Sequence, residues 1–150
     1  MYCEDVHEDA DDGVPAERPV SSYLIGKPCS SHYSPFGRGT KGYIAWHLEK
    51  RRWVFLKDMW KDVSNQVHSE LEVYKRLKQN NVRCVPTAIG GGTCGSITDA
   101  QDLFPSAAPR PARVHTRLVL LQVARPLEDY QDAKHLILII WCALSGPFQL

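Results

Sequence analysis

The sequence FGRGTKGYIAWHLEKRRWVFLK at residues 36–57 joins a glycine-rich segment to two short apolar runs. Aromatic and β-branched side chains in the runs 41–48 and 53–57 are typical of strands. The charged segment 49–52 between them is short enough for a turn. Two strands this close in sequence pair as an antiparallel hairpin. This stretch therefore predicts an antiparallel sheet.

Residues 63–78 predict a helix after the hairpin, because their apolar side chains fall on one face at about 100° per residue. Those side chains are Val63, Val67, Tyr74 and Leu77. Asp62 or Ser64 could cap its beginning. Asn80 and Asn81 follow its basic C-terminal end and would stop it.

The remaining pattern adds two strands and a second helix. Residues 82–89 predict a short strand carrying a proline, and 117–123 (RLVLLQV) predict a buried one. Between them, 90–111 reads as a loose connection with a turn of helix at 99–104. Residues 129–144 predict a final helix that is apolar on too many sides to stand free in water. We expect an α+β domain: a twisted antiparallel sheet with one packed helix, plus a C-terminal helix.

Length and charge restrict the classes of function. The chain has 150 residues and a net charge of +1, so we expect one domain and no general attraction to nucleic acid or membrane. Acidic residues crowd the N-terminus, and residues 1–20 predict a disordered acidic tail. The rest of the chain is basic, which suits an anion such as a nucleotide.

No metal site, disulfide framework or export signal is visible. The cysteines number 5, an odd count, and none has Cys-x-x-Cys spacing. The longest apolar run, 136–144, is far shorter than the roughly 20 residues of a membrane span. We expect reduced thiols in an intracellular protein, cytoplasmic or nuclear.

Gly37, Gly39 and Gly42 form a G-x-G-x-x-G motif. Glycines let backbone N–H groups approach phosphates. A dinucleotide fold needs a helix after this motif, whereas here a hairpin follows, as in a strand–turn–strand flap over nucleotide phosphates. Ile44 then occupies the apolar position two places after the last glycine. An ordinary glycine-rich turn remains the alternative.

Lys57 and Glu70 are the candidate charged pair. Trp53, Phe55 and Lys57 share one side of a strand, and Glu70 lies on the apolar face of the predicted helix. A carboxylate among apolar side chains is costly unless it is paired, and a lysine on the neighbouring strand is its natural partner. The alternatives are a solvated lysine at a strand end and a glutamate that reaches water.

Several sequence segments, in the same order along the chain, resemble the fungal-type protein kinase family of basidiomycete fungi. They are RPVSSYLIGKP (18–28), FGRGTKGY (36–43), VFLKDMWKD (54–62), ELEVYKRL (70–77), VRCVPT (82–87) and RLVLLQVARPLEDY (117–130). The resemblance runs from about Arg18 to about Leu144 and implies a partial kinase-like domain over 21–144: the small lobe, the hinge and the following helix.

The resemblance also implies roles for residues. Gly37, Gly39, Gly42 and Ile44 would form the flap over ATP, and Lys57 and Glu70 the ion pair that holds the lysine against the α- and β-phosphates. Leu120 would be the gatekeeper. Leu121 and Val123 would offer backbone groups to adenine.

The departures from the family concern catalysis. No H-R-D and no D-F-G occurs in the sequence, so it supplies no catalytic residue and no Mg²⁺ ligand. The tail 145–150 no longer resembles the family, and we expect a truncated product. Phe55 stands where many kinases place a small alanine against adenine, which would narrow the pocket.

The expected function is that of a fungal-type kinase domain, whose family activity is phosphoryl transfer from ATP to protein serine or threonine. This chain is expected to be catalytically incomplete, a pseudokinase-like fragment. The alternatives are a non-catalytic protein-interaction module and a non-functional truncated fragment. The apolar helix 129–144 would favour self-association or a protein partner.

Two other patterns carry less weight. Residues 90–95 (GGGTCG) also fit G-x-G-x-x-G but lack a βαβ context, so a flexible connection is favoured over a phosphate site. The tryptophans and basic residues around 46–61 could suggest base stacking, but the low net charge argues against a nucleic-acid partner.

Overall fold

The computed structural model describes residues 2–7, 20–31, 39–63, 69–98 and 112–145. It is an α+β structure built on one antiparallel sheet of 7 strands. The strands are β1 (Tyr2–His7), β2 (Val20–Ile25), β3 (Ser30–Ser31), β4 (Lys41–His47), β5 (Arg52–Asp62), β6 (Ala88–Thr98) and β7 (Arg113–Leu120). The helices are α1 (Glu70–Gln79), the 3₁₀ turn η1 (Leu127–Asp129) and α2 (Ala133–Ser145).

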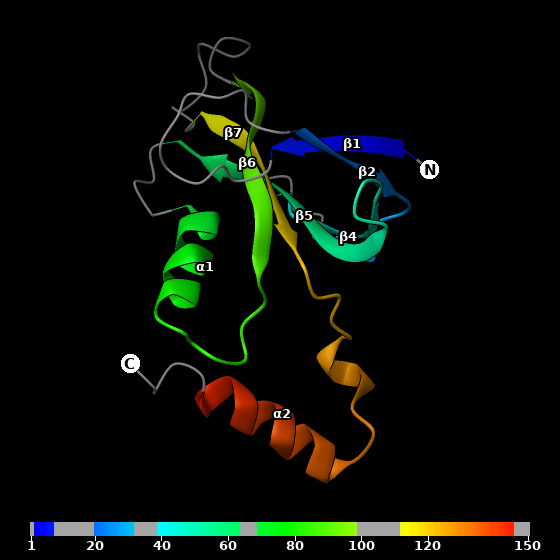
Figure 1. Ribbon diagram of the computed structural model, residues 1–150, viewed down its shortest axis with the longest axis vertical. Helices are drawn as coiled ribbons and strands as arrows, with labels where there is room; N and C mark the ends of the chain where they lie inside the picture. Colours follow the sequence, from blue (N-terminus) through cyan, green and yellow to red (C-terminus); the bar gives the residue numbers. More distant parts are fainter. Residues whose placement is uncertain (1, 8–19, 32–38, 64–68, 99–111, 146–150) are drawn as a thin grey trace, which may run out of the picture.

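The sheet order is β1-β2-β4-β5-β7-β6, with the short β3 pairing β4. The predicted hairpin is present, since Ala45 pairs with Val54 and Gly42 with Lys57. Contacts between β1 and β6 bring the two edge strands together, so the sheet curls (Figure 1).

Each face of the sheet carries its own apolar cluster. The larger cluster lies inside the curl and contains Tyr23, Ile25, Tyr43, Ala45, Val54, Leu56 and Val119. The smaller cluster, on the other face, contains Met59, Leu118 and Leu120. Leu71 and Tyr74 of α1 pack against it, which fixes the helix on that face.

The helix begins later than predicted. Ser69 is its N-cap: its hydroxyl accepts from the Glu72 N–H, and the Glu72 carboxylate accepts from the Ser69 N–H. Asp62, one of the two predicted caps, instead ends β5 opposite Arg113. The other, Ser64, lies outside the described residues. Pairing with β7 extends β5, and the capping box then sets the first helical turn.

The prediction of a loose connection over 90–111 is wrong for 90–98, because β6 continues to Thr98. Its glycines weaken strand propensity, yet β7 pairs with it from Ala88 to Thr98. A Cβ on Gly91 would lie 2.7 Å from the Arg117 carbonyl oxygen. The glycine therefore permits a close approach of the two strands. The helical turn predicted at 99–104 lies outside the described residues.

Three further boundaries differ from prediction. Tyr2–His7 pairs along β2 rather than lacking structure, while 8–19 lie outside the described residues. β7 ends at Leu120, so the 121–123 segment leaves the sheet. The last helix begins at Ala133.

The connection 121–132 holds no buried residue, and α2 lies apart from the sheet (Figure 1). No helix of the described part of the chain is long and apolar enough to cross a membrane.

Candidate functional site

An ion pair joins the sheet to α1. The Lys57 Nζ lies 2.7 Å from Glu70 Oε1 and 2.8 Å from Oε2, so it donates to both carboxylate oxygens. Lys57 points from the middle of β5, and Glu70 is the first residue of α1. The side chains are 28% and 32% exposed, so the pair lies at the edge of the packed surface and its lysine remains reachable.

The strand register places the predicted glycine segment beside this lysine. Gly42 is directly opposite Lys57, and Ile44 is opposite Phe55. Alternation then puts these four residues on one face of the sheet, the face that α1 also occupies. Ile44 is 46% exposed and borders open space.

Phe55 fills the sheet face next to Gly42. A Cβ built on Gly42 would lie 2.7 Å from the Phe55 Cζ and 2.4 Å from the Ser30 Oγ. On its other side, Phe55 packs with the cluster that contains Leu120. The ring therefore takes up part of the space between the glycine segment and the end of β7.

The other two glycines of the motif are Gly37 and Gly39. Gly39 has φ +54°, a left-handed conformation that favours glycine. It lies next to Trp60, whose Cδ1 would be 3.5 Å from an added Cβ. Gly37 lies outside the described residues.

The segment after β7 is tied to the segment before β6. Leu121 N–H donates to the Thr87 carbonyl at 2.8 Å. Thr87 N–H donates to Gln122 Oε1 at 2.7 Å, and Gln122 Nε2 donates back to the Thr87 hydroxyl at 3.4 Å. These bonds hold the chain just beyond Leu120, where Val123 is 38% exposed. The only sign of these bonds in the sequence is a polar residue, Gln122, inside an apolar run.

The structure thus brings together Gly42, Ile44, Lys57 and Glu70 on one face. Leu120 joins them, because it pairs with Phe55 across β5 and β7. Leu121 and Val123 follow at the end of this strand. The arrangement can present a cation, an apolar wall and backbone groups to one ligand.

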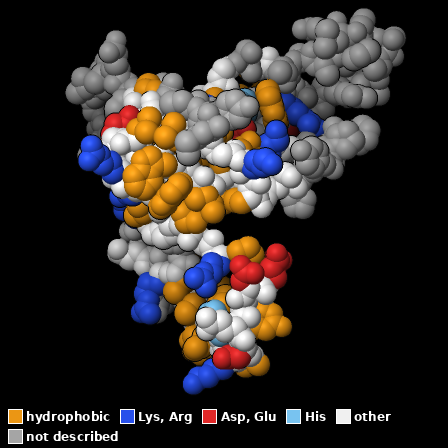
Figure 2. Space-filling model, turned by 90° about the vertical axis from the view of Figure 1, so that its right-hand side faces the viewer, with side chains coloured by type: hydrophobic (Ala, Val, Ile, Leu, Met, Phe, Trp, Pro, Cys, Tyr) orange, Lys and Arg blue, Asp and Glu red, His pale blue; other side chains and the backbone are white. Residues whose placement is uncertain are grey.

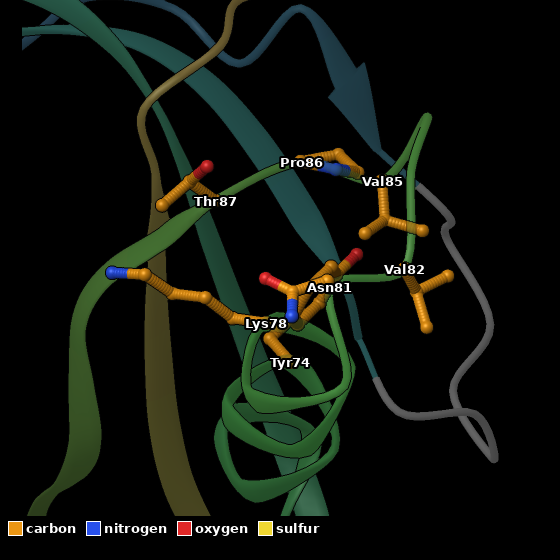
Figure 3. Close-up of a pocket in the computed structure, with 7 residues that line it drawn as sticks. All are labelled: Tyr74, Lys78, Asn81, Val82, Val85, Pro86 and Thr87. Carbon is orange, nitrogen blue, oxygen red and sulfur yellow. The ribbon is translucent and has the colours of Figure 1, made fainter. Parts of the chain in front are cut away.

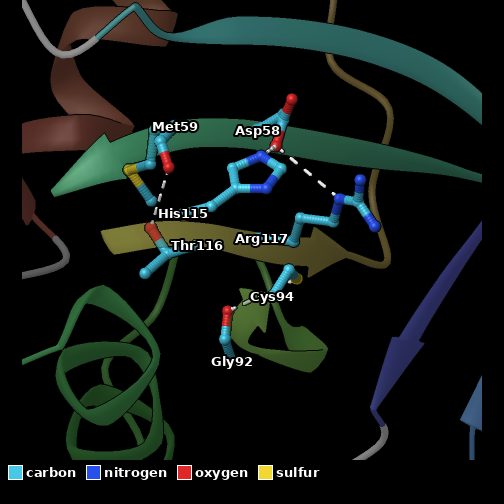
Figure 4. A network of polar contacts seen from close by, with 7 residues as sticks. All are labelled: Asp58, Met59, Gly92, Cys94, His115, Thr116 and Arg117. Carbon is cyan, nitrogen blue, oxygen red and sulfur yellow. Dashed lines mark hydrogen bonds and ion pairs between the residues drawn. The ribbon is translucent and has the colours of Figure 1, made fainter. Parts of the chain in front are cut away.

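A polar cluster that was not anticipated lies on the opposite face (Figure 4). Asp58 contacts His115 Nε2 through Oδ1, and the same oxygen lies 3.6 Å from Arg117 Nε. Trp60 stacks on His115 with ring centroids 4.8 Å apart. Since Asp58 and Trp60 alternate with Lys57, this cluster ties β5 to β7 from behind the candidate site.

A shallow pocket of about 260 Å³ lies at the other end of α1 (Figure 3). It is lined by Tyr74, Lys78, Asn81, Val82, Val85, Pro86 and Thr87. Burial, and after it the Glu70 carboxylate, raises the pKa of Tyr74 above its ordinary value of 10.0. Lys78 lies roughly 12 Å along the helix from Glu70, at 1.5 Å per residue, so the pocket is separate from the ion pair.

Metal ligation finds no support in the described ranges, which hold no group of three or more His, Cys, Asp or Glu side chains suited to an ion. In the described ranges, no disulfide is formed by Cys29, Cys84, Cys94 or Cys142.

Comparison with known proteins adds no relative. No protein-family model matches the chain, and neither a curated protein nor a solved structure matches it.

Proposed function

We propose that this chain is the small lobe of a fungal-type kinase-like domain and binds ATP beside Lys57. The observation that carries the proposal is the bidentate contact between Lys57 and Glu70. A glycine-rich segment, a strand lysine and a helix glutamate occur in that order along the chain, as they do in protein kinases. The same sheet face would supply the apolar wall and the backbone groups for the base.

The phosphates would meet Lys57 and the backbone of the segment that ends at Gly42. Glu70 neutralises and orients the ammonium group, so Lys57 would approach the α- and β-phosphates with a fixed direction. Ile44 and Leu120 offer an apolar wall for the base. The backbone of Leu121 and Val123 would then contact the adenine edge.

Phe55 makes the proposed site a poor one for adenine. Its ring stands between Gly42 and Leu120, on the face where a base would lie. We therefore expect weak binding, with phosphate contacts contributing more than base contacts.

Phosphoryl transfer is not expected from these 150 residues. The sequence has neither H-R-D, whose aspartate accepts the substrate proton, nor D-F-G, whose aspartate holds Mg²⁺. Any Mg²⁺ would arrive on the phosphates of ATP, without a protein ligand from this chain. Such a protein would bind nucleotide without turning it over.

Thermal shift with and without 5–10 mM Mg-ATP tests the proposal. We expect a small rise in Tm, because a ligand that binds only the folded state stabilises it. Lys57→Ala should abolish the rise. Lys50→Ala, which removes the same charge at the turn between β4 and β5, should keep it. A Tm that Mg-ATP does not move, or a shift that survives Lys57→Ala, would overturn the proposal.

A second candidate is a protein-interaction module without a nucleotide. The exposure of Trp141 (68%) and Ile137 (66%) on α2 favours it, because exposed apolar patches mark interaction sites. The same thermal shift separates the candidates, since a module of this kind would not respond to Mg-ATP.

A further inference from the structure

The half of the sheet face that α1 leaves open carries an apolar surface, which we call the tryptophan face. Register and alternation place its side chains on the same side as Lys57. It consists of Val20, Leu24, Ile44, Trp46, Trp53 and Phe55. Trp46 and Trp53 meet edge to face with ring centroids 5.0 Å apart. Trp53 is 55% and Val20 53% exposed, so water covers much of this surface.

α2 carries a second apolar surface, the α2 stripe. Ile137, Ile140, Trp141 and Leu144 follow at spacings of three, four and seven residues, which puts them on one side of a helix. Each of them is at least 47% exposed. Figure 2 shows hydrophobic side chains gathered on the sheet end of the molecule and again on the helix below it.

Both surfaces are apolar. Neither contains a charged side chain, so each can be covered by an apolar surface without burying an unpaired charge. A helix stripe against an open sheet face is also the packing that α1 already makes, through Leu71 and Tyr74, on the other half of the same face. The tryptophan face can therefore accept a second helix beside α1.

We infer that the α2 stripe of one copy packs on the tryptophan face of a second copy, and the reverse, in a twofold dimer. Each copy offers one stripe and one face, so reciprocal exchange uses both and closes the assembly. Neither the connection 121–132 nor α2 contains a buried residue, so no buried side chain of these two segments holds α2 against its own sheet.

The two tryptophans of each copy supply about a third of the area that a stable dimer interface buries. Burying an aromatic side chain removes about 150–250 Å² from water. Trp53 and Trp141 are each more than half exposed. Two copies of both would then remove on the order of 500 Å², and the aliphatic side chains of both surfaces add to this. A stable interface buries about 1,600 Å² in total.

The dimer would also limit access to the proposed nucleotide site, because Ile44 and Phe55 belong to the tryptophan face and also border that site. This inference goes beyond the proposed function and does not depend on it. Its test contains no nucleotide, so the dimer can fail while ATP binding stands, and the reverse.

Light scattering after size exclusion measures the mass of the 150-residue chain at 5–200 μM. We expect a dimer that dissociates on dilution. Trp53→Glu on the face and Trp141→Glu on the stripe should each weaken dimerisation at least tenfold. Val73→Glu, at a 42% exposed position on α1 outside both surfaces, should leave it unchanged.

Mixing the two variants gives the sharpest outcome. A Trp53→Glu copy keeps its stripe and a Trp141→Glu copy keeps its face, so the mixture should regain one contact and associate more tightly than either variant alone. Val20→Glu and Ile137→Glu provide a second pair if a tryptophan variant does not fold, as judged by circular dichroism.

Three results would overturn the inference. A monomer at 200 μM would mean that α2 closes on its own sheet or stays free. A dimer that survives both Trp53→Glu and Val20→Glu would mean that the helices pair with each other. A mixture no tighter than its components would exclude the reciprocal contact.

Discussion

The Lys57 ammonium group donates to both carboxylate oxygens of Glu70, across 13 positions of sequence and between two different elements. The pair fixes the beginning of α1 over the middle of β5. With about 30% of each side chain exposed, the pair contributes little stability, because water and salt screen it. Its main consequence is the direction in which the lysine points.

Glu70→Gln removes the carboxylate charge while keeping the shape of the side chain. We expect the free energy of unfolding, from urea denaturation, to fall by no more than about 1 kcal/mol. The Mg-ATP thermal shift should nevertheless be lost, because the ammonium group loses its orienting partner. Glu128→Gln, in the exposed turn η1, is the control and should change neither quantity. If Glu70→Gln lowered the free energy of unfolding by more than about 3 kcal/mol, the pair would be a major source of stability and this account would be contradicted.

Phe55→Ala should separate stability from nucleotide affinity. Removing a partly buried ring costs roughly 2 kcal/mol, less than a fully buried phenylalanine. The same change clears space between Gly42 and Leu120, so the Mg-ATP thermal shift should grow. Phe55→Leu keeps most of the side-chain volume. It should therefore leave both the free energy of unfolding and the Mg-ATP thermal shift nearly unchanged. A smaller shift in Phe55→Ala would show that the ring supports the nucleotide rather than obstructing it.

Gly42→Ala should destabilise the sheet. The added Cβ would lie 2.4 Å from the Ser30 Oγ and 2.7 Å from the Phe55 ring, so both must move. Such overpacking costs about 1–3 kcal/mol. Gly26→Ala meets nothing within 4 Å and serves as the matched control. In the Phe55→Ala background the cost of Gly42→Ala should fall, and an unchanged cost would exclude the ring as its cause.

Ser69→Ala tests whether the capping box sets the position of Glu70. The change removes the acceptor for the Glu72 N–H, which costs about 1 kcal/mol. We expect fraying of the first turn of α1, and with it a weaker Mg-ATP shift. Hydrogen exchange at the first-turn amides measures the fraying. Faster exchange spread equally over the whole sheet would point to global destabilisation instead.

We expect Tyr74 to make the stability of the folded state depend on pH in the alkaline range. Its pKa is raised in the folded state, so the folded state holds the phenolic proton more strongly than the unfolded state does. The resulting stability is fully present below about pH 10 and is lost as pH rises through the folded pKa. Above about pH 10, the wild type should therefore lose stability with rising pH more steeply than Tyr74→Phe does. Equal slopes would contradict the prediction.

Local pattern predicted the hairpin and the charged pair. The β4–β5 hairpin follows from two β-rich runs around a short charged turn, and Lys57 sits on the expected side of it. Glu70 is the candidate partner because a carboxylate on an apolar helix face is costly unless it is paired. Both inferences use only the periods of strands and helices, and the contact between the two residues agrees with them.

Other features depend on partners distant in sequence. β6 forms despite its glycines because β7 lies beside it, and β5 continues to Asp62 because Arg113 pairs there. The Asp58–His115 contact joins residues 57 positions apart, which no local pattern could reveal. The bonds between Thr87 and Gln122 span 35 positions.

The spacing of neighbouring side chains is enough to predict the α+β class, the hairpin and the residues able to form a charged pair. That Gly42 faces Lys57, that Phe55 fills the space beside them, and that α2 stands clear of the sheet became apparent only in three dimensions. Strand register and packing between elements create those relationships, and both depend on contacts that the linear order does not contain.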